Sequence, residues 1–137
     1  MKIVICGSMS VSKEMLQIKL DLEKRGHSII LPKDTEKYAS EEKKYENRNE
    51  STQNKIDDDL IRSYFKIIEK ADAVIAANYN KKHQKNYLGG NTFLEIGFAH
   101  VLNKKIYLIN PIPNISYADE IKAMKPIILN GDLSKIK

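Results

Sequence analysis

Short apolar runs alternate along the chain with segments whose apolar residues recur every three or four positions. The first run, Lys2–Cys6, is almost wholly apolar and predicts a buried strand. The next segment has helical spacing and a natural stop at Gly26; its apolar residues are Val11, Met15, Ile18 and Leu22. Strands that alternate with helices are typical of βαβ units around a parallel sheet.

The same pattern divides the rest of the chain into four more strands and three more helices. The strands are predicted at Ser28–Leu31, Asp72–Asn78, Ile106–Asn110 and Pro126–Leu129. The helices are predicted from Ile56 to about Lys70, after Thr92 to about Asn103, and at Ser116–Met124. The Ala, Val and Ile of Asp72–Asn78 indicate a strand that is buried on both faces.

These elements predict an α/β fold with a flavodoxin-like, doubly wound parallel sheet of five strands, helices on both faces and the order 2-1-3-4-5. The 137 residues suit a single domain. In such sheets ligands bind beyond the carboxyl ends of the strands, where the first and third strands diverge. The loops to inspect are therefore Gly7–Ser10, Asn78–Thr92 and Asn110–Ser116.

A charged insertion, Lys33–Asn54, follows the second strand and holds neither Gly nor Pro. It is predicted to be partly helical, either as a lid or as a surface excursion that the fold tolerates. Six basic and six acidic residues cancel between Lys33 and Lys55, so long nucleic acid is not a favoured partner. The compact basic cluster Lys81–Lys85 could attract a small anionic ligand or simply be solvated.

Composition narrows the class of protein further. Hydrophobic residues make up 42% and charged residues 30%, which is ordinary for a globular protein, and the apolar runs are too short to span a bilayer. The start reads as a strand rather than a signal peptide, and a lone cysteine, Cys6, fits a reducing compartment, so a cytoplasmic location is expected. The three histidines are scattered, so no metal site is predicted, and no cofactor is expected.

Two glycine-containing turns precede helices at the edge of the sheet where a ligand is expected. The first joins the first strand to its helix and consists of Cys6, Gly7, Ser8, Met9 and Ser10. The second consists of Gly89, Gly90, Asn91 and Thr92. Helix amino termini carry unpaired amides that attract anions, although each turn alone is also explained as a tight, capped connection. Together with Asn78, the residues of these turns other than Thr92 are predicted to bind substrate.

Glu95 admits two interpretations. Thr92-x-x-Glu95 matches a capping box, in which the glutamate bonds back to the amide of the capping residue. Alternatively, Glu95 lies at the rim of the pocket as a nucleophile toward an anomeric carbon, since a carboxylate can form and release a glycosyl ester.

The segments Ile5-Cys6-Gly7-Ser8, Gly89–Ala99 and Asn103–Leu108 resemble those of nucleoside 2-deoxyribosyltransferases and of the related 2′-deoxynucleoside 5′-phosphate N-hydrolases. The resemblance implies that Glu95, in its Glu-hydrophobic-Gly-x-Ala context, is the nucleophile. It also implies cleavage of an N-glycosidic bond, completed by water or by a second base, and a homodimer. Gly90-x-Thr92-x-x-Glu95 is in addition a distant parallel to the cytokinin-activating phosphoribohydrolases.

The sequence departs from that family at several positions. Val4 stands where the family has a tyrosine, Gly89 where it has Asp or Ser, and Ser10 where the hydrolases have an arginine, with Lys13 nearby. Tyr64 replaces a family aspartate and is either a substitute catalytic donor or a core residue. Two functions are therefore expected as alternatives: an N-glycosidase or base transferase acting on a (deoxy)nucleoside or its 5′-monophosphate, or a non-catalytic nucleotide-binding module.

Overall fold

The predicted sheet is present in the computed structural model, which describes residues 1–40, 56 and 59–137. Its strands are β1 (Lys2–Cys6), β2 (Ser28–Ile30), β3 (Ala73–Ala76), β4 (Lys105–Leu108) and β5 (Ile127–Ile128). All neighbours pair in parallel, in the order β2-β1-β3-β4-β5. The predicted strand order and the flavodoxin-like α/β architecture are thus confirmed.

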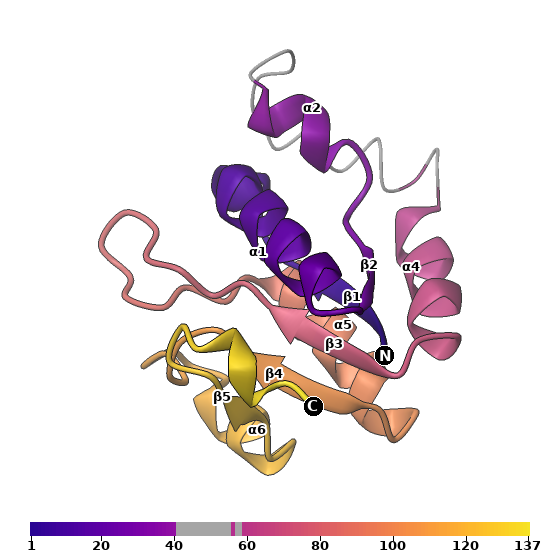
Figure 1. Cartoon of the computed structure of the whole chain (residues 1–137). Coiled ribbons are helices and arrows are strands. Elements are labelled where there is room, and N and C mark those ends of the chain that lie inside the picture. The colour runs from indigo at the N-terminus through magenta and orange to yellow at the C-terminus, as the bar shows by residue number, and fades with distance from the viewer. Residues whose placement is uncertain (41–55, 57–58) are drawn as a thin grey trace.

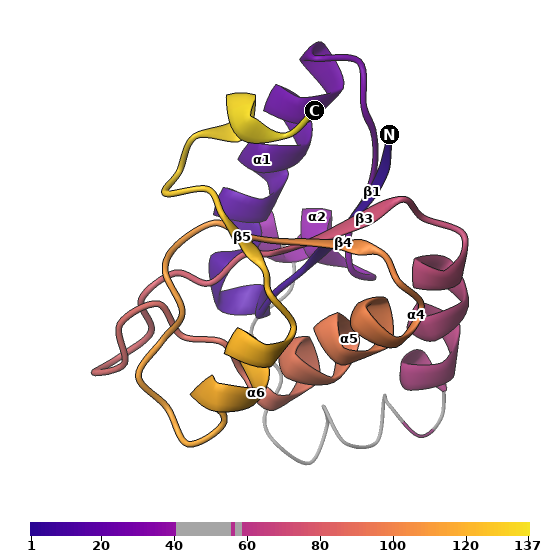
Figure 2. The ribbon, with the colours of Figure 1, turned by 90° about the horizontal axis from the view of Figure 1, so that it is seen from below.

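Helices cover both faces of the sheet (Figure 1). They are α1 (Ser12–Lys24), α2 (Thr35–Ala39), α4 (Leu60–Glu69), α5 (Gly90–Val101) and α6 (Ala118–Ala123), with short 3-10 helices η1 (Met9–Val11) and η2 (Leu133–Lys135). Seen along the sheet, α1 and η2 lie on one side, and α4, α5 and α6 lie on the other (Figure 2). Helix α2 packs on the outside of α1.

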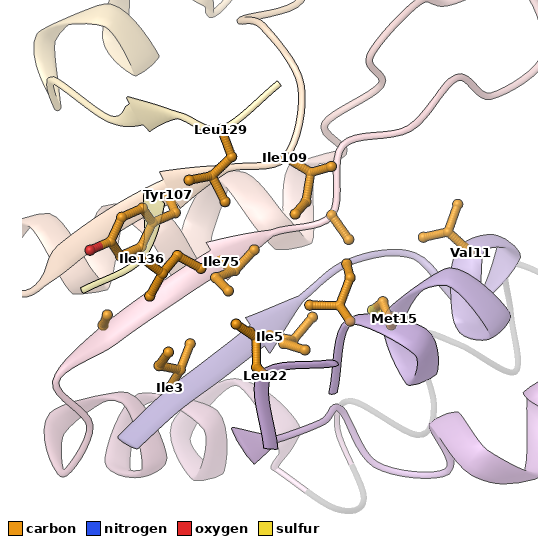
Figure 3. Close-up of a cluster of buried hydrophobic side chains, with 13 residues drawn as sticks. Ile3, Ile5, Val11, Met15, Leu22, Ile75, Tyr107, Ile109, Leu129 and Ile136 are labelled. Atoms are coloured by element: carbon orange, nitrogen blue, oxygen red, sulfur yellow. The ribbon is translucent and has the colours of Figure 1, made fainter. Parts of the chain in front are cut away.

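The core beneath α1 is built from side chains that point from one face of the strands (Figure 3). Met15 and Leu22 of α1 are fully buried there, because the helical spacing read from the sequence puts them on one side. The far end of the chain also contributes, since Leu129 and Ile136 complete the same core. Leu129 belongs to the predicted fifth strand, but the sequence pattern did not predict the contribution of Ile136.

The other core lies between the sheet and the three helices α4, α5 and α6. Strand residues Val4, Val74 and Leu108 meet Ile68 of α4 and Ile96 of α5 there, and all of them are fully buried. Strand β3 is buried along its whole length, as its composition predicted. Two layers of helices around this central strand therefore fix the loops that leave its carboxyl end.

Several of the predicted strands extend beyond the strands of the structure. The third strand ends at Ala76 rather than Asn78, because Asn78 turns its side chain to the neighbouring loop. The fourth strand likewise ends at Leu108. Of the predicted insertion 33–54, residues 35–39 form α2, which agrees with a partly helical segment, and residues 41–54 lie outside the described residues. In the described part of the chain, no helix is long and apolar enough to cross a membrane.

Candidate functional site

A hollow opens at the carboxyl edge of the sheet, between the loops that follow β1 and β3. Its empty space of about 270 Å³ includes open solvent, so it is a surface hollow rather than an enclosed cavity. Its lining comes from the turn after β1, from the loop between β3 and α5, and from the start of α5: Gly7, Ser8, Ser10, Val11, Ala77, Tyr79, Lys81, Tyr87, Gly89 and Thr92. The strand order diverges at this place, and two of the three loops singled out from the sequence, Gly7–Ser10 and Asn78–Thr92, contribute to the lining, whereas Asn110–Ser116 does not.

The turn after β1 is tight and rich in hydroxyl groups. A Cβ atom on Gly7 would lie 2.9 Å from Met15 Sδ and 3.2 Å from Ala77 Cβ, so only glycine fits without displacing the core. Ser8 then caps η1: its Oγ accepts hydrogen bonds from the amide of Ser10 at 3.3 Å and from the hydroxyl of Ser10 at 3.0 Å. Two hydroxyls are thereby held at the wall of the hollow.

The loop between β3 and α5 projects from the same edge of the sheet (Figure 1) and folds back as a small hairpin. Lys81 and Gln84 exchange two main-chain hydrogen bonds of 3.0 Å, and the amide of Tyr87 donates to the carbonyl of Tyr79 at 2.9 Å. The hairpin directs Lys81 inward: its Nζ donates to Ser8 Oγ at 3.3 Å and lies 5.1 Å from the centre of the Tyr87 ring. The ammonium group of Lys81 thus reaches the Ser8 hydroxyl at the wall of the hollow.

The start of α5 differs from the predicted capping box. Helix α5 begins at Gly90, with Gly89 as its N-cap, and no side chain caps it. The amide of Phe93 already donates to the carbonyl of Gly89 at 2.8 Å, so Thr92 lies inside the first turn and cannot be the cap. The capping interpretation of Glu95 is therefore wrong. A buried carboxylate inside this helix needs another explanation.

Glu95 lies one turn further along α5, on the helix face that Thr92 also occupies. It is only 7% exposed, and Asn91 Nδ2 donates to its Oε1 at 3.4 Å. Thr92 itself lines the hollow and is equally buried. The carboxylate is therefore turned away from solvent, but Glu95 is not among the residues that line the hollow.

Cys6 and Tyr64 share the surroundings of Glu95. Burial, and after it the charge of Glu95, raises the pKa of the Cys6 thiol well above its usual range. Burial, followed by Cys6 and Glu95, likewise raises the pKa of Tyr64, whose hydroxyl donates to the carbonyl of Ile5 at 2.5 Å. Both groups therefore keep their protons at neutral pH, so the Cys6 thiol is not a nucleophile there.

Asn78 is 1% exposed and ties together the loops that follow β3 and β4. Its Nδ2 donates to the carbonyls of Asn110 and Pro111, at 2.8 and 3.1 Å, and its Oδ1 accepts from the amide of Asn110 at 2.9 Å. The Nδ2 of Asn110 donates in return to the carbonyl of Asn78 at 3.2 Å. The side chain of Asn78 thus serves the scaffold.

The structure brings together only part of the predicted substrate-binding set. Gly7, Ser8, Ser10 and Gly89 line the hollow. The remaining residues do not: Cys6 is buried in the core, Met9 packs on the α1 side, Asn78 braces two loops, and Gly90 and Asn91 are exposed at the start of α5. Tyr64 faces inward from α4, and its hydroxyl bonds to β1.

Three lining side chains escaped the sequence analysis as individual site residues: Tyr79, Lys81 and Tyr87. They belong to a loop that was predicted only as polar. The sequence feature that could have identified them is a pair of tyrosines on either side of a basic cluster, in a loop at the point where the strand order diverges. Lys81 lay within the cluster considered as an attractor of anions, but its direction depends on the hairpin.

Comparisons with known proteins bear on the fold. No protein-family model matches the chain, and no curated protein matches its sequence. Among solved structures, the CMP N-glycosidase BcmB of Clostridium botulinum is similar, with a TM-score of 0.56 and 16% sequence identity. The match covers 93% of this chain and 85% of that one, so the likeness extends over nearly the whole domain. At this identity it shows a shared fold.

Proposed function

We propose that this protein breaks the N-glycosidic bond of a (deoxy)nucleoside or nucleoside 5′-monophosphate, releasing the base to water or exchanging it for another, with Glu95 as the nucleophile. The observation that carries the proposal is the buried carboxylate of Glu95, one helical turn from Thr92 at the wall of the hollow and not used as a helix cap. Burying a carboxylate costs free energy because the charged form loses its hydration. Such buried acids are retained at sites where they take part in catalysis.

The proposed reaction has two displacements. A carboxylate oxygen of Glu95 attacks the anomeric carbon and forms a glycosyl ester, while the bond from that carbon to the base nitrogen breaks, and the base leaves with the electron pair and takes a proton from solvent water. Water, or the nitrogen of a second base, then attacks the same carbon, loses its proton to solvent, and frees the carboxylate of Glu95. The amide of Asn91, which donates to Glu95 Oε1 at 3.4 Å, would help to orient the carboxylate.

Tyr64 enters this proposal mainly as a support. A tyrosine with a raised pKa keeps its proton at neutral pH, as a donor to the departing base must. That proton is directed at the carbonyl of Ile5, however, which fixes α4 to β1 beside Glu95. The tentative assignment of Tyr64 as a catalytic donor requires this bond to open when substrate is present.

The likeness to BcmB supports the same class of reaction, because that protein is a CMP N-glycosidase and the match spans nearly the whole chain. A homodimer, implied by the family resemblance, stays a prediction that sedimentation at micromolar concentration would test.

A nucleotide-binding module without catalysis is the second candidate. It is favoured by one specific observation: Glu95 is not among the residues that line the hollow, whereas the serines and Lys81 are. A ligand could therefore sit against the glycine and serine turn without touching the carboxylate.

The deciding experiment is to incubate the pure protein with a panel of nucleosides and 5′-monophosphates, with and without an acceptor base, and to measure released or exchanged base by chromatography. The Glu95→Gln variant keeps the size of the side chain and removes its charge. The matched control, Glu120→Gln, makes the same change at an exposed position on α6.

We expect base release from the parent and from Glu120→Gln, and a loss of at least about a thousandfold in Glu95→Gln, the order seen when a nucleophile is removed. Turnover that survives in Glu95→Gln would reject the assignment of the nucleophile. The absence of any turnover in the parent would favour the binding module.

A further inference from the structure

Thr92 connects the hollow with the buried carboxylate of α5. It is 7% exposed, it lines the hollow, and it lies one helical turn before Glu95 on the same face of the helix. Side chains three residues apart on a helix have Cβ atoms about 5–6 Å apart. A ligand group that touches Thr92 is therefore next to the proposed nucleophile, although Glu95 itself does not line the hollow.

The hydroxyl group of Thr92 makes no hydrogen bond to any residue that the structure describes. A threonine inside a helix commonly donates to the carbonyl four residues earlier, which here belongs to Leu88. The hydroxyl of Tyr117 donates to that carbonyl instead, at 2.5 Å. The next carbonyl, of Gly89, accepts from the amide of Phe93 at 2.8 Å. The hydroxyl of Thr92 is therefore uncommitted.

This uncommitted hydroxyl faces the hollow. Among the described residues, no fully buried polar side-chain atom lacks a hydrogen-bond partner, so the hydroxyl of Thr92 must keep access to solvent. Only 7% of the residue is exposed, and the surface that it lines is the hollow. A polar group in such a place costs free energy unless water or a ligand bonds to it.

Thr35 shows what a buried threonine with a structural role looks like in the same chain. It is 2% exposed, and its hydroxyl donates to the carbonyl of Pro32 at 2.6 Å. The two threonines are thus similarly buried, but only the hydroxyl of Thr35 is used by the fold. The hydroxyl of Thr92 is available for a ligand.

We propose that Thr92 is a sugar-binding residue, whose hydroxyl bonds to an oxygen of the nucleoside's sugar and holds the anomeric carbon within reach of Glu95. The inference rests on the proposed function for the identity of the ligand, and on the uncommitted hydroxyl for the contact. A hydroxyl both donates and accepts, as sugar hydroxyls do. The sugar rather than the base is assigned to Thr92 because the carbon that Glu95 attacks belongs to the sugar.

The first part of the test measures stability. Thr92→Val and Thr35→Val both replace a hydroxyl by a methyl group, and valine and threonine have similar helix propensities. Thr35→Val should lower the midpoint of urea unfolding, because it breaks a hydrogen bond. Thr92→Val should leave the midpoint unchanged or raise it, because it breaks none. Equal decreases in the two variants would overturn the premise that the hydroxyl of Thr92 is uncommitted.

The second part measures binding in the Glu95→Gln background, where the ligand is not consumed. Calorimetric titration compares each nucleoside of the panel with its free base. We expect Thr92→Val to weaken nucleoside binding three- to tenfold, the order expected for one hydrogen bond, and to leave binding of the free base unchanged. Thr92→Ser keeps the hydroxyl and should keep most of the affinity, and Thr35→Val should bind like the parent.

Three results would overturn the sugar contact: nucleoside binding that is unchanged in Thr92→Val, a loss that the free base shares, or no binding of any nucleoside. A loss in Thr92→Val that Thr92→Ser does not restore would also overturn it, since the methyl group rather than the hydroxyl would then be responsible.

The two proposals fail in different ways. Glu95-dependent release of base, with KM and kcat unchanged in Thr92→Val, would keep the proposed function and reject the sugar contact. Binding of nucleosides that depends on the hydroxyl of Thr92, without release or exchange of base, would keep the sugar contact and reject the catalytic proposal.

Discussion

Replacing Asn78 by alanine should destabilise the protein far more than replacing its partner Asn110. Asn78→Ala removes three side-chain hydrogen bonds, two to the carbonyls of Asn110 and Pro111 and one from the amide of Asn110. The position is 1% exposed, so water cannot replace them without opening the loop. At about 1 kcal/mol each, the loss is about 3 kcal/mol of unfolding free energy.

Asn110→Ala is the matched control, because it removes only the bond from its own Nδ2 to the carbonyl of Asn78. The main-chain groups of Asn110 still bond to the side chain of Asn78, so the expected loss is about 1 kcal/mol. The two losses differ by about 2 kcal/mol because Asn78 makes its bonds with side-chain atoms, which the substitution removes, whereas Asn110 accepts and donates mainly with main-chain atoms, which remain.

Equilibrium unfolding in urea, followed by circular dichroism, measures both variants. With a slope of about 1–3 kcal/mol per molar urea, the midpoints of the two variants should differ by roughly 1 M. Equal losses of unfolding free energy in the two variants would refute the idea that the side chain of Asn78 holds the two loops together. A loss below about 1 kcal/mol in Asn78→Ala would refute it as well, since one net hydrogen bond contributes that much.

Two smaller predictions concern the surroundings of Glu95 and the start of α5. Tyr64→Phe should lower stability by about 1 kcal/mol, because the carbonyl of Ile5 loses its donor, and should reduce base release less than tenfold; a loss of about a hundredfold or more would instead make Tyr64 the acid. Gly89→Ala should displace the ring of Tyr87, whose hydroxyl would lie 3.0 Å from the new Cβ, whereas Gly90→Ala meets open space and should be neutral or stabilising. Urea unfolding and the NMR shifts of the ring compare the two, and indistinguishable shifts would contradict the packing.

The architecture could be predicted because its signals are local and repeated. Each strand is a short apolar run, each helix on a core face has its own apolar spacing, and the handedness of crossover connections leaves few possible orders. The position of the hollow followed from that order, since the turn after β1 and the loop after β3 must meet where the order diverges.

The direction of Lys81 could not be predicted, because it depends on the backbone of a loop. Lys82 and Asn86 both adopt positive φ, 52° and 55°, and these angles close the hairpin. Asparagine favours such angles, but lysine does not, so the sequence signals only one of the two turns. Two isolated tyrosines at the ends of the loop likewise resemble ordinary surface residues.

The false capping box at Thr92 and Glu95 has a similar cause. The motif Thr-x-x-Glu is satisfied by sequence alone, but the helix already begins at Gly90 and uses the carbonyl of Gly89. A helix that begins three residues earlier than predicted changes the role of every side chain in its first turns. Boundaries are the least certain part of such predictions, and here the boundary decides the chemistry assigned to Glu95.

Ile136 lies in the core between α1 and the sheet, and its late place in the sequence affects folding during synthesis. Helix α1 ends at Lys24, so 112 more residues, up to and including Ile136, must be added before this core is complete. At about 5–20 residues per second, a ribosome needs roughly 6–22 s to add them. During that interval the apolar face shared by α1 and β1 lacks its final cover. The nascent chain therefore exposes this apolar surface for several seconds. A chaperone that binds apolar segments at the exit of the ribosomal tunnel is suited to cover it.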